Sequence, residues 1–212
     1  MPKLPGLFDS FDNLDQVLPE DVALGLKPIP QANLLENYLA NRILYPGTLP
    51  LTEQDMKIDL SILREALKPN ALLGDNPFLN TILRKVLIPA RFLNFVPDIE
   101  SLVFPFIDAL LLGREKQDFF EDLWTIVLTG DTDEVIGSLL LPQFDSSSGV
   151  MDLKLQSQRY EINQGSFKVI SCLKERCEIA YKIQKGRMLG KQESAVEVYG
   201  GKLGLVVDGR SV

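Results

Sequence analysis

The sequence of 212 residues contains no histidine. Histidine is the usual general base near neutral pH and a frequent zinc ligand. Its absence excludes Ser-His-Asp catalysis, Cys-His catalysis and histidine-bearing metal sites. An enzyme of this composition would have to work with carboxylates, lysines or a bound nucleotide. We therefore expect a protein that is not an enzyme and that has no catalytic, cofactor-binding or metal-binding residues.

The sequence is also poor in cysteine, with only Cys172 and Cys177. Four residues separate the two, so they form neither a C-x-x-C redox pair nor a four-ligand zinc site. We expect two small, half-buried side chains in the reduced form. A disulfide across neighbouring strands is the alternative.

Long apolar runs are missing as well. The longest are far shorter than the ~20 residues that a membrane-spanning helix needs, and the opening MPKLPG lacks the apolar core of a signal peptide. We expect a cytoplasmic protein with no membrane partner. The net charge of −7 disfavours nucleic-acid binding, which requires a dense basic face. The one basic cluster, at residues 182–191, is typical of a solvated strand edge and turn.

Apolar residues make up 45% of the chain, which is enough for a folded core. Residues 1–33 are rich in proline and acidic residues and predict an extended N-terminal arm that docks on a partner. Its candidate contact residues are apolar: Phe8, Phe11, Leu14, Val17 and Leu18. The alternative is an ordered lead-in whose apolar side chains fold back onto Leu24 and Leu26.

Residues 34–144 predict a helical α/β domain. Apolar spacing predicts helices over 32–44, 51–69, 75–89 and 98–113, the last with a kink at Pro105. Thr52 and Asp55 have capping-box spacing at the start of the second helix, and Pro69 is expected to end it. Residues 122–131 read as a buried strand, and a helix over 132–142 is expected to follow.

Residues 149–212 predict a small antiparallel β domain. The joint at 145–149 is rich in serine, and beyond it the apolar period changes from 3.6 to 2 residues. About five short strands separated by turn signals favour a sandwich or barrel. The whole chain is therefore expected to have an α+β fold, with a mainly helical α/β layer followed by this β domain.

The chain ends on EVYGGKLGLVVDGRSV, which lacks the spacing of a phosphate-binding loop. We expect a hairpin turn at Gly200–Gly201, where positive φ is allowed, followed by a last strand. Gly204 inside that strand indicates a bulge or a close approach of another backbone.

The segment YGGKLGLVVDGR also resembles the closing segment of the glutamate mutase L family, the MutL-like proteins unrelated to mismatch repair. Four other segments are similar to family segments that occur in the same order: NYLANRILYPGTLPLTEQDMKIDLSILREAL, PDIESLVFPFIDALL, GSLLLPQF and QGSFKVISC. The resemblance runs from about Asn37 to Arg210. It implies kinship with the sugar kinase, actin and Hsp70 superfamily.

Members of that superfamily bind ATP through glycine-rich phosphate loops of the type D-x-G-[ST]-x-[ST], and no such loop occurs here. The stretch ARFLNFVPDIES has no glycine where the family has a glycine-rich nucleotide segment. The resemblance therefore implies the C-terminal half of such a protein, standing alone, with its nucleotide-binding part lost or carried by another polypeptide.

Acidic residues cluster in two places. Asp131, Asp133 and Glu134 follow the predicted strand, where they favour a helix start and could alternatively bind Mg²⁺. Residues 115–122 predict an exposed helix end.

Together these features favour a non-catalytic accessory subunit that binds another protein in a hetero-oligomer, with no cofactor. One alternative is part of an ATP-dependent reactivating or chaperone-like factor, completed by a separate nucleotide-binding chain. Another is a hydrolase or transferase that uses Asp131 and Glu134.

Overall fold

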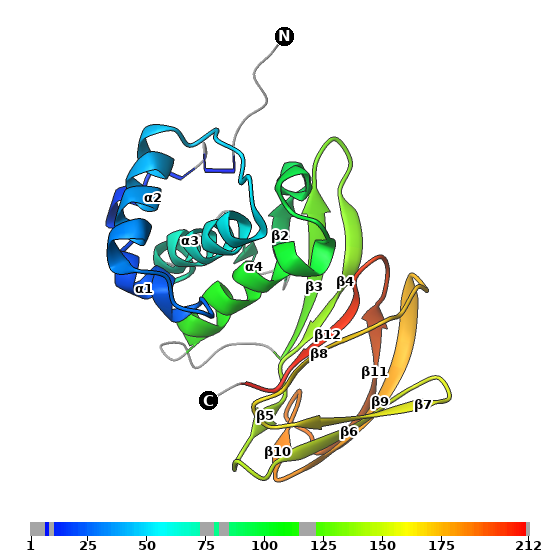
Figure 1. Ribbon diagram of the computed structural model, residues 1–212. Coiled ribbons are helices and arrows are strands. Elements are labelled where there is room, and N and C mark those ends of the chain that lie inside the picture. The colour runs from blue at the N-terminus through cyan, green and yellow to red at the C-terminus, as the bar shows by residue number, and fades with distance from the viewer. Residues whose placement is uncertain (1–6, 9–10, 73–78, 81–84, 115–121, 211–212) are drawn as a thin grey trace. The chain divides into compact units, whose positions relative to one another are not determined.

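The computed structural model describes residues 7–8, 11–72, 79–80, 85–114 and 122–210, and they divide into two compact units (Figure 1). The helical unit comprises Met1–Asn76 and Arg91–Gly113, and the β unit comprises Pro77–Ala90 and Arg114–Val212. The predicted boundaries at 33/34 and 144/149 do not coincide with this division. Residues before 144 supply strands to the β unit, and the lead-in packs into the helical unit.

The helical unit contains the elements η1 Leu14–Gln16, α1 Pro19–Leu24, α2 Ala32–Leu44, α3 Glu53–Leu72, η2 Ala90–Phe95 and α4 Ile99–Arg114. The predicted helices at 32–44, 51–69 and 98–113 are confirmed, although α3 continues past Pro69 to Leu72. The capping box is present, since the Asp55 amide donates to Thr52 Oγ1 and the Thr52 amide to Asp55 Oδ2, each at 3.0 Å. Asp98 begins α4 in a similar way by accepting from the Ser101 amide at 2.7 Å.

The β unit contains the strands β1 Leu79–Asn80, β2 Lys85–Pro89, β3 Leu123–Thr129, β4 Glu134–Leu140, β5 Gln143–Phe144, β6 Val150–Leu155, β7 Gln158–Asn163, β8 Phe167–Ile170, β9 Arg176–Gln184, β10 Gly186–Arg187, β11 Glu193–Tyr199 and β12 Gly204–Asp208. They form a six-stranded sheet in the order β1-β2-β3-β4-β12-β8, a four-stranded sheet in the order β11-β9-β6-β7, and the pair β10-β5. The four-stranded sheet is antiparallel throughout, whereas the six-stranded sheet has the parallel pairs β2–β3 and β12–β4.

The two larger sheets share an apolar core. Residues of β9 alternate strictly between exposed and buried, as a strand with one solvated face should. Their buried side chains join those of the six-stranded sheet in one cluster that includes Leu140, Leu205 and Val207 on one side and Leu153, Ile179 and Ile183 on the other. The predicted α+β class is confirmed, with helices mainly in the N-terminal part and a β sandwich in the C-terminal part.

Two predicted helices are wrong. Residues 134–140 form β4, and residues 85–89 of the predicted helix 75–89 form β2. In β4 five consecutive positions are buried, so its burial does not alternate. In β2 buried residues alternate with half-buried ones, but Val86, Leu87 and Ile88 are all apolar, so its sequence shows no alternation either. A strand covered on both faces gives no period of 2, so its apolar run is easily read as a helix.

The C-terminal strand β12 lies inside its sheet, between β4 and β8. Gly204 has φ 85°, and a Cβ atom there would be 2.4 Å from the Ile170 carbonyl oxygen, which confirms the expected close approach. The predicted hairpin at Gly200–Gly201 is wrong, because β11 pairs with β9 and not with β12. The glycine turn carries the chain from one sheet to the other.

Cys172 and Cys177 are joined by a disulfide, which corrects the expectation of reduced thiols. The bond links the connection that follows β8 to the start of β9 and closes a short loop with a sequence separation of 5. In the described part of the chain, no helix has both the length and the apolar character needed to cross a membrane.

Candidate functional site

The predicted contact residues of the N-terminal arm are mostly buried inside the helical unit. Phe8, Phe11, Leu14 and Val17 are each at most 8% exposed, and only Leu18, at 50%, faces solvent. The Phe11 ring stacks on Phe92 with centroids 6.4 Å apart. The fold-back alternative therefore describes these side chains. Leu26 is buried, as that alternative expects, whereas Leu24 is exposed.

The acidic cluster after β3 does not begin a helix. Asp131 and Asp133 are exposed in the β3–β4 connection, and Glu134 starts β4, where its carboxylate accepts from Lys202 Nζ at 2.9 Å. Across the described residues, no three potential ligands come close enough together to hold a metal ion. The predicted helix end at 115–122 lies outside the described residues except for Asp122, which is buried and accepts from the Leu189 amide.

The connection between α2 and α3 displays an unusual set of apolar side chains. We call residues 44–51 the apolar loop. Four of its large side chains are more than half exposed: Leu44 at 69%, Tyr45 at 65%, Leu49 at 55% and Leu51 at 89%. Single exposed apolar residues are common, but several in one short loop are typical of an interaction surface.

A groove of about 390 Å³ runs beside the apolar loop. Its lining is mostly apolar and comes from the loop and the start of α3 on one side, and from the η2–α4 connection on the other: Leu49, Pro50, Leu51, Thr52, Glu53, Met56, Asn94, Phe95, Val96 and Pro97. Glu53 is the only charged residue in this lining. The groove can therefore accept an apolar side chain from a partner.

The backbone of the apolar loop is fixed by hydrogen bonds on its inner side. Arg42 Nη1 donates to the Thr48 carbonyl oxygen at 2.5 Å. Thr48 closes a turn, because its amide and its hydroxyl both donate to the Tyr45 carbonyl oxygen, at 3.1 and 2.9 Å. At the far end the Leu51 amide donates to Asp55 Oδ2 at 3.3 Å. The exposed side chains thus project from an ordered backbone.

Arg42 is itself held by a buried carboxylate. Its Nε and Nη2 donate to the two oxygens of Asp59, each at 2.8 Å, and Tyr38 donates to the same carboxylate at 3.0 Å. Asp59 is only 2% exposed. Burial raises the pKa of Asp59 to about 6, since desolvation outweighs the opposing effect of the Arg42 guanidinium. Burial and the Asp59 carboxylate likewise raise the pKa of Tyr38 above its ordinary value.

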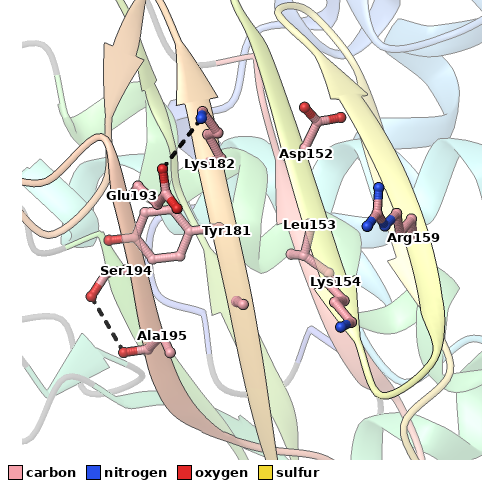
Figure 2. A pocket seen from close by; sticks show the side chains of 10 residues that line it. Asp152, Leu153, Lys154, Arg159, Tyr181, Lys182, Glu193, Ser194 and Ala195 are labelled. Carbon is pink, nitrogen blue, oxygen red and sulfur yellow. Dashed lines mark hydrogen bonds and ion pairs between the residues drawn. The ribbon is translucent and has the colours of Figure 1, made fainter.

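A second surface lies on the outer face of the four-stranded sheet, where a hollow of about 600 Å³ is lined by residues of all four strands (Figure 2). Its central row across the sheet is Arg159, Lys154, Ala180 and Ala195, each paired with the next in register. The two alanines are flanked by longer side chains, including the ion pair Lys182–Glu193 at 3.4 Å. The hollow exists because these two positions are small.

The predicted basic cluster at 182–191 is confirmed as solvated. Lys182, Lys185, Arg187 and Lys191 are all exposed, and Lys185 donates to Ser148 Oγ at 2.7 Å.

Sequence reasoning missed both surfaces. The apolar loop had a signal, because LYPGTLPL carries leucines in a connection that should be polar. The cation pair Lys154 and Arg159 had no such signal in the sequence, since their juxtaposition depends on the register of β6 and β7.

No model of a protein family matches this chain, and comparisons with curated proteins and with solved structures give no match either. The resemblance to the MutL-like family therefore stays a prediction that depends on its quoted segments.

Proposed function

We propose that the chain is a non-catalytic accessory subunit that binds another protein through the apolar loop and the groove beside it. One observation carries the proposal: four large apolar side chains are exposed on a loop whose backbone is fixed by Arg42, Thr48 and Asp55.

Exposed apolar side chains on a fixed backbone favour binding for two reasons. Burying each one against a partner removes apolar surface from water, at roughly 25 cal/mol per Å². An ordered loop also loses less conformational entropy on binding than a flexible one. Leu51, almost fully exposed at 89%, therefore has the most apolar surface to lose to a partner.

The surroundings of the groove favour a particular partner chemistry. Asp98 is exposed directly after the lining residue Pro97, and Glu53 lines the groove as the partner of Lys57 in an ion pair at 2.6 Å. The chain as a whole carries a net charge of −7. We therefore propose a partner segment with apolar anchors and neighbouring basic side chains, because opposite charges at the rim speed association and exclude wrong partners.

The test begins with chemical crosslinking of the full chain in native extract and identification of the crosslinked protein. The partner is then purified, and its dissociation constant is measured for wild type, Leu49→Ser and Leu51→Ser. We expect each substitution to weaken binding by about ten-fold, the effect of removing one well-buried apolar contact. Leu173→Ser is the matched control, since Leu173 is 83% exposed in the β unit.

Equal affinity for wild type and both loop variants would contradict the proposal. So would a purified chain that binds its own copies through the loop, because the proposed assembly is a hetero-oligomer. Circular dichroism of each variant checks that the helices of the unit are retained.

The resemblance to the MutL-like family supports a second candidate, part of an ATP-dependent reactivating or chaperone-like factor completed by a separate nucleotide-binding chain. Calorimetric titration with ATP and Mg²⁺ separates the two. Binding of ATP by the reconstituted complex but not by either protein alone supports the second candidate. A complex that binds no ATP supports the first.

The cytoplasm is the proposed location, and the Cys172–Cys177 disulfide is the observation against it, because disulfides persist mainly in oxidising compartments. Counting free thiols in protein that is trapped with an alkylating agent at the moment of cell lysis tests this point. A count of two free thiols per chain would support the cytoplasm. A count of zero would contradict it.

A further inference from the structure

We propose that the hollow on the outer face of the four-stranded sheet binds a small organic oxyanion, a carboxylate or a phosphate, between Lys154 and Arg159. This site goes beyond the proposed protein binding. It lies in the β unit, whereas the apolar loop belongs to the helical unit, so the failure of one proposal leaves the other untouched.

The first argument is the pairing of two cations. Lys154 of β6 and Arg159 of β7 are directly opposite each other in the strand register, and both are exposed on the outer face. Like charges at directly opposite positions of neighbouring strands destabilise a sheet. The same sheet also places acids opposite each other, Asp152 with Glu161 and Glu178 with Glu197. At the cation pair, an anion bound between Lys154 and Arg159 would remove the repulsion.

The second argument is the absence of a protein counter-charge within the described residues. The other cations of this face have one, since Lys182 lies 3.4 Å from Glu193 and Arg176 lies 3.3 Å from Glu197. For Lys154 and Arg159 no carboxylate of the described chain comes within ion-pair distance, and Figure 2 shows no dashed line to either. The acids beside them, Asp152 and Glu161, occupy the next row of the sheet.

The third argument is the space beside the cations. Along the central row, Lys154 pairs with Ala180, which pairs with Ala195, so the floor next to the cations is small and uncharged. A volume of about 600 Å³ is in the range of small-molecule sites. Long side chains border this floor on both sides along the strands, Lys182 with Glu193 and Glu178 with Glu197. This border favours a compact ligand over an extended polymer.

A neighbouring hollow of about 400 Å³ shares Lys154 and Ala180 and adds Lys174, Arg176 and the acidic Glu178 to its lining. Lys154 thus lies between two hollows with further basic side chains. The lining of the larger hollow carries three cations, Lys154, Arg159 and Lys182, and two carboxylates, Asp152 and Glu193. An ammonium and a guanidinium together suit an oxyanion, since the guanidinium can donate two parallel hydrogen bonds and the ammonium adds a point charge.

The experiment is an NMR titration of the full chain, with inorganic phosphate, succinate and a glutamate-rich peptide as separate probes at constant ionic strength. We expect saturable shifts of the amides of Lys154, Arg159 and Ala180 with phosphate or succinate. Lys154→Gln and Arg159→Gln should each weaken that binding by about ten-fold, the effect of losing one charge-assisted contact. Arg187→Gln removes an equal charge outside the hollow and should change affinity by less than about two-fold.

Shifts that do not saturate, or that survive both Gln variants, would overturn the proposal. Binding of the glutamate-rich peptide alone would also overturn it, in favour of a protein partner. Urea unfolding gives a second readout. Without ligand, Lys154→Gln should be at least as stable as wild type because the repulsion is relieved, and added phosphate should stabilise wild type more than the variant. A variant less stable than wild type in chloride would show that Lys154 serves the fold.

Discussion

Replacement of Gly204 by alanine tests the close packing of strands in the β unit. Gly204 has φ 85°, and an alanine Cβ would lie 2.4 Å from the Ile170 carbonyl oxygen and 2.8 Å from the Cys172 amide nitrogen. Both neighbours are backbone atoms, so they cannot swing away as a side chain would. The strand β12 lies between β4 and β8, which means that a shift of β12 would disturb two ladders of hydrogen bonds.

Two costs add at this position. Holding an alanine at positive φ costs about 1–2 kcal/mol. Forcing an extra carbon into a closely packed site costs about 1–3 kcal/mol more, which gives about 2–5 kcal/mol in total. Gly165→Ala is the matched control, because Gly165 also has positive φ, 81°, but nothing lies within 4 Å of its Cβ position. The free energy of unfolding of the control should fall only by the cost of alanine at positive φ, about 1–2 kcal/mol.

Urea unfolding followed by the fluorescence of Trp124 measures this difference. Trp124 is the single tryptophan, lies in β3 and is 3% exposed, so it reports on the β unit. We expect the free energy of unfolding to fall further in Gly204→Ala than in Gly165→Ala by about 1–3 kcal/mol. Equal losses in the two variants would refute the packing argument and leave only the backbone conformation as the cost.

Three further outcomes are expected. Asp59 has a pKa of about 6 in the folded state against an ordinary 3.8, so as the pH falls it becomes protonated in the folded state before it does in the unfolded state. Its contribution to the free energy of unfolding should be largest below pH 4 and decrease as the pH rises through 6, by at most about 3 kcal/mol. Unfolding of wild type and Asp59→Asn at each pH measures this, and a constant difference contradicts it. Reduction of the Cys172–Cys177 disulfide should lower the free energy of unfolding by about 2 kcal/mol for a loop of this length, and the reductant should have no effect on the double alanine variant. Asp131→Ala should leave partner binding unchanged, since Asp131 is exposed in the β unit; any lost hydrolase or transferase activity would favour an enzyme.

The helices of the helical unit were predictable because their signals are local. The Thr52 amide donates to Asp55 and the Asp55 amide to Thr52, as the capping-box spacing predicts. The apolar spacing of the same helix, at Met56, Leu60, Leu63 and Leu67, predicts one buried face, and the structure buries Leu63 and Leu67 fully and the other two by half. The expected end at Pro69 was wrong, because a single proline interrupts a helix without always stopping it.

The strands of the six-stranded sheet were less predictable, because their burial depends on the rest of the chain. Residues 136–140 of β4 are all buried, so the sequence IGSLL shows no alternation. By contrast, β6 and β9 have one solvated face, and their alternation gave the correct structure. Gly204 predicted a close approach of another backbone, because that requirement is local. The strands that pair with β12 could not be predicted from the residues of β12 itself.

The candidate sites depend on long-range geometry to different degrees. An apolar loop between two predicted helices can be suspected from its composition, but its rigidity depends on Arg42 reaching Asp59, 17 residues away. The cation pair on the sheet depends entirely on register, because a slip of one residue between β6 and β7 would place one of the two cations on the opposite face.

The rigidity of the apolar loop is the strongest reason to regard its exposure as functional. A buried ion pair is a weak source of stability, because desolvation of the two charges offsets much of their attraction. The raised pKa of Asp59 is consistent with that balance. Here the pair leaves one guanidinium hydrogen bond for the Thr48 carbonyl oxygen, and that bond fixes the loop that exposes Leu49 and Leu51. A chain selected for stability alone would gain more from an apolar pair at these positions and a polar loop outside them. The buried Arg42–Asp59 pair and the exposed apolar side chains of the loop are both unfavourable for the isolated chain. A partner that covers the loop explains the two together.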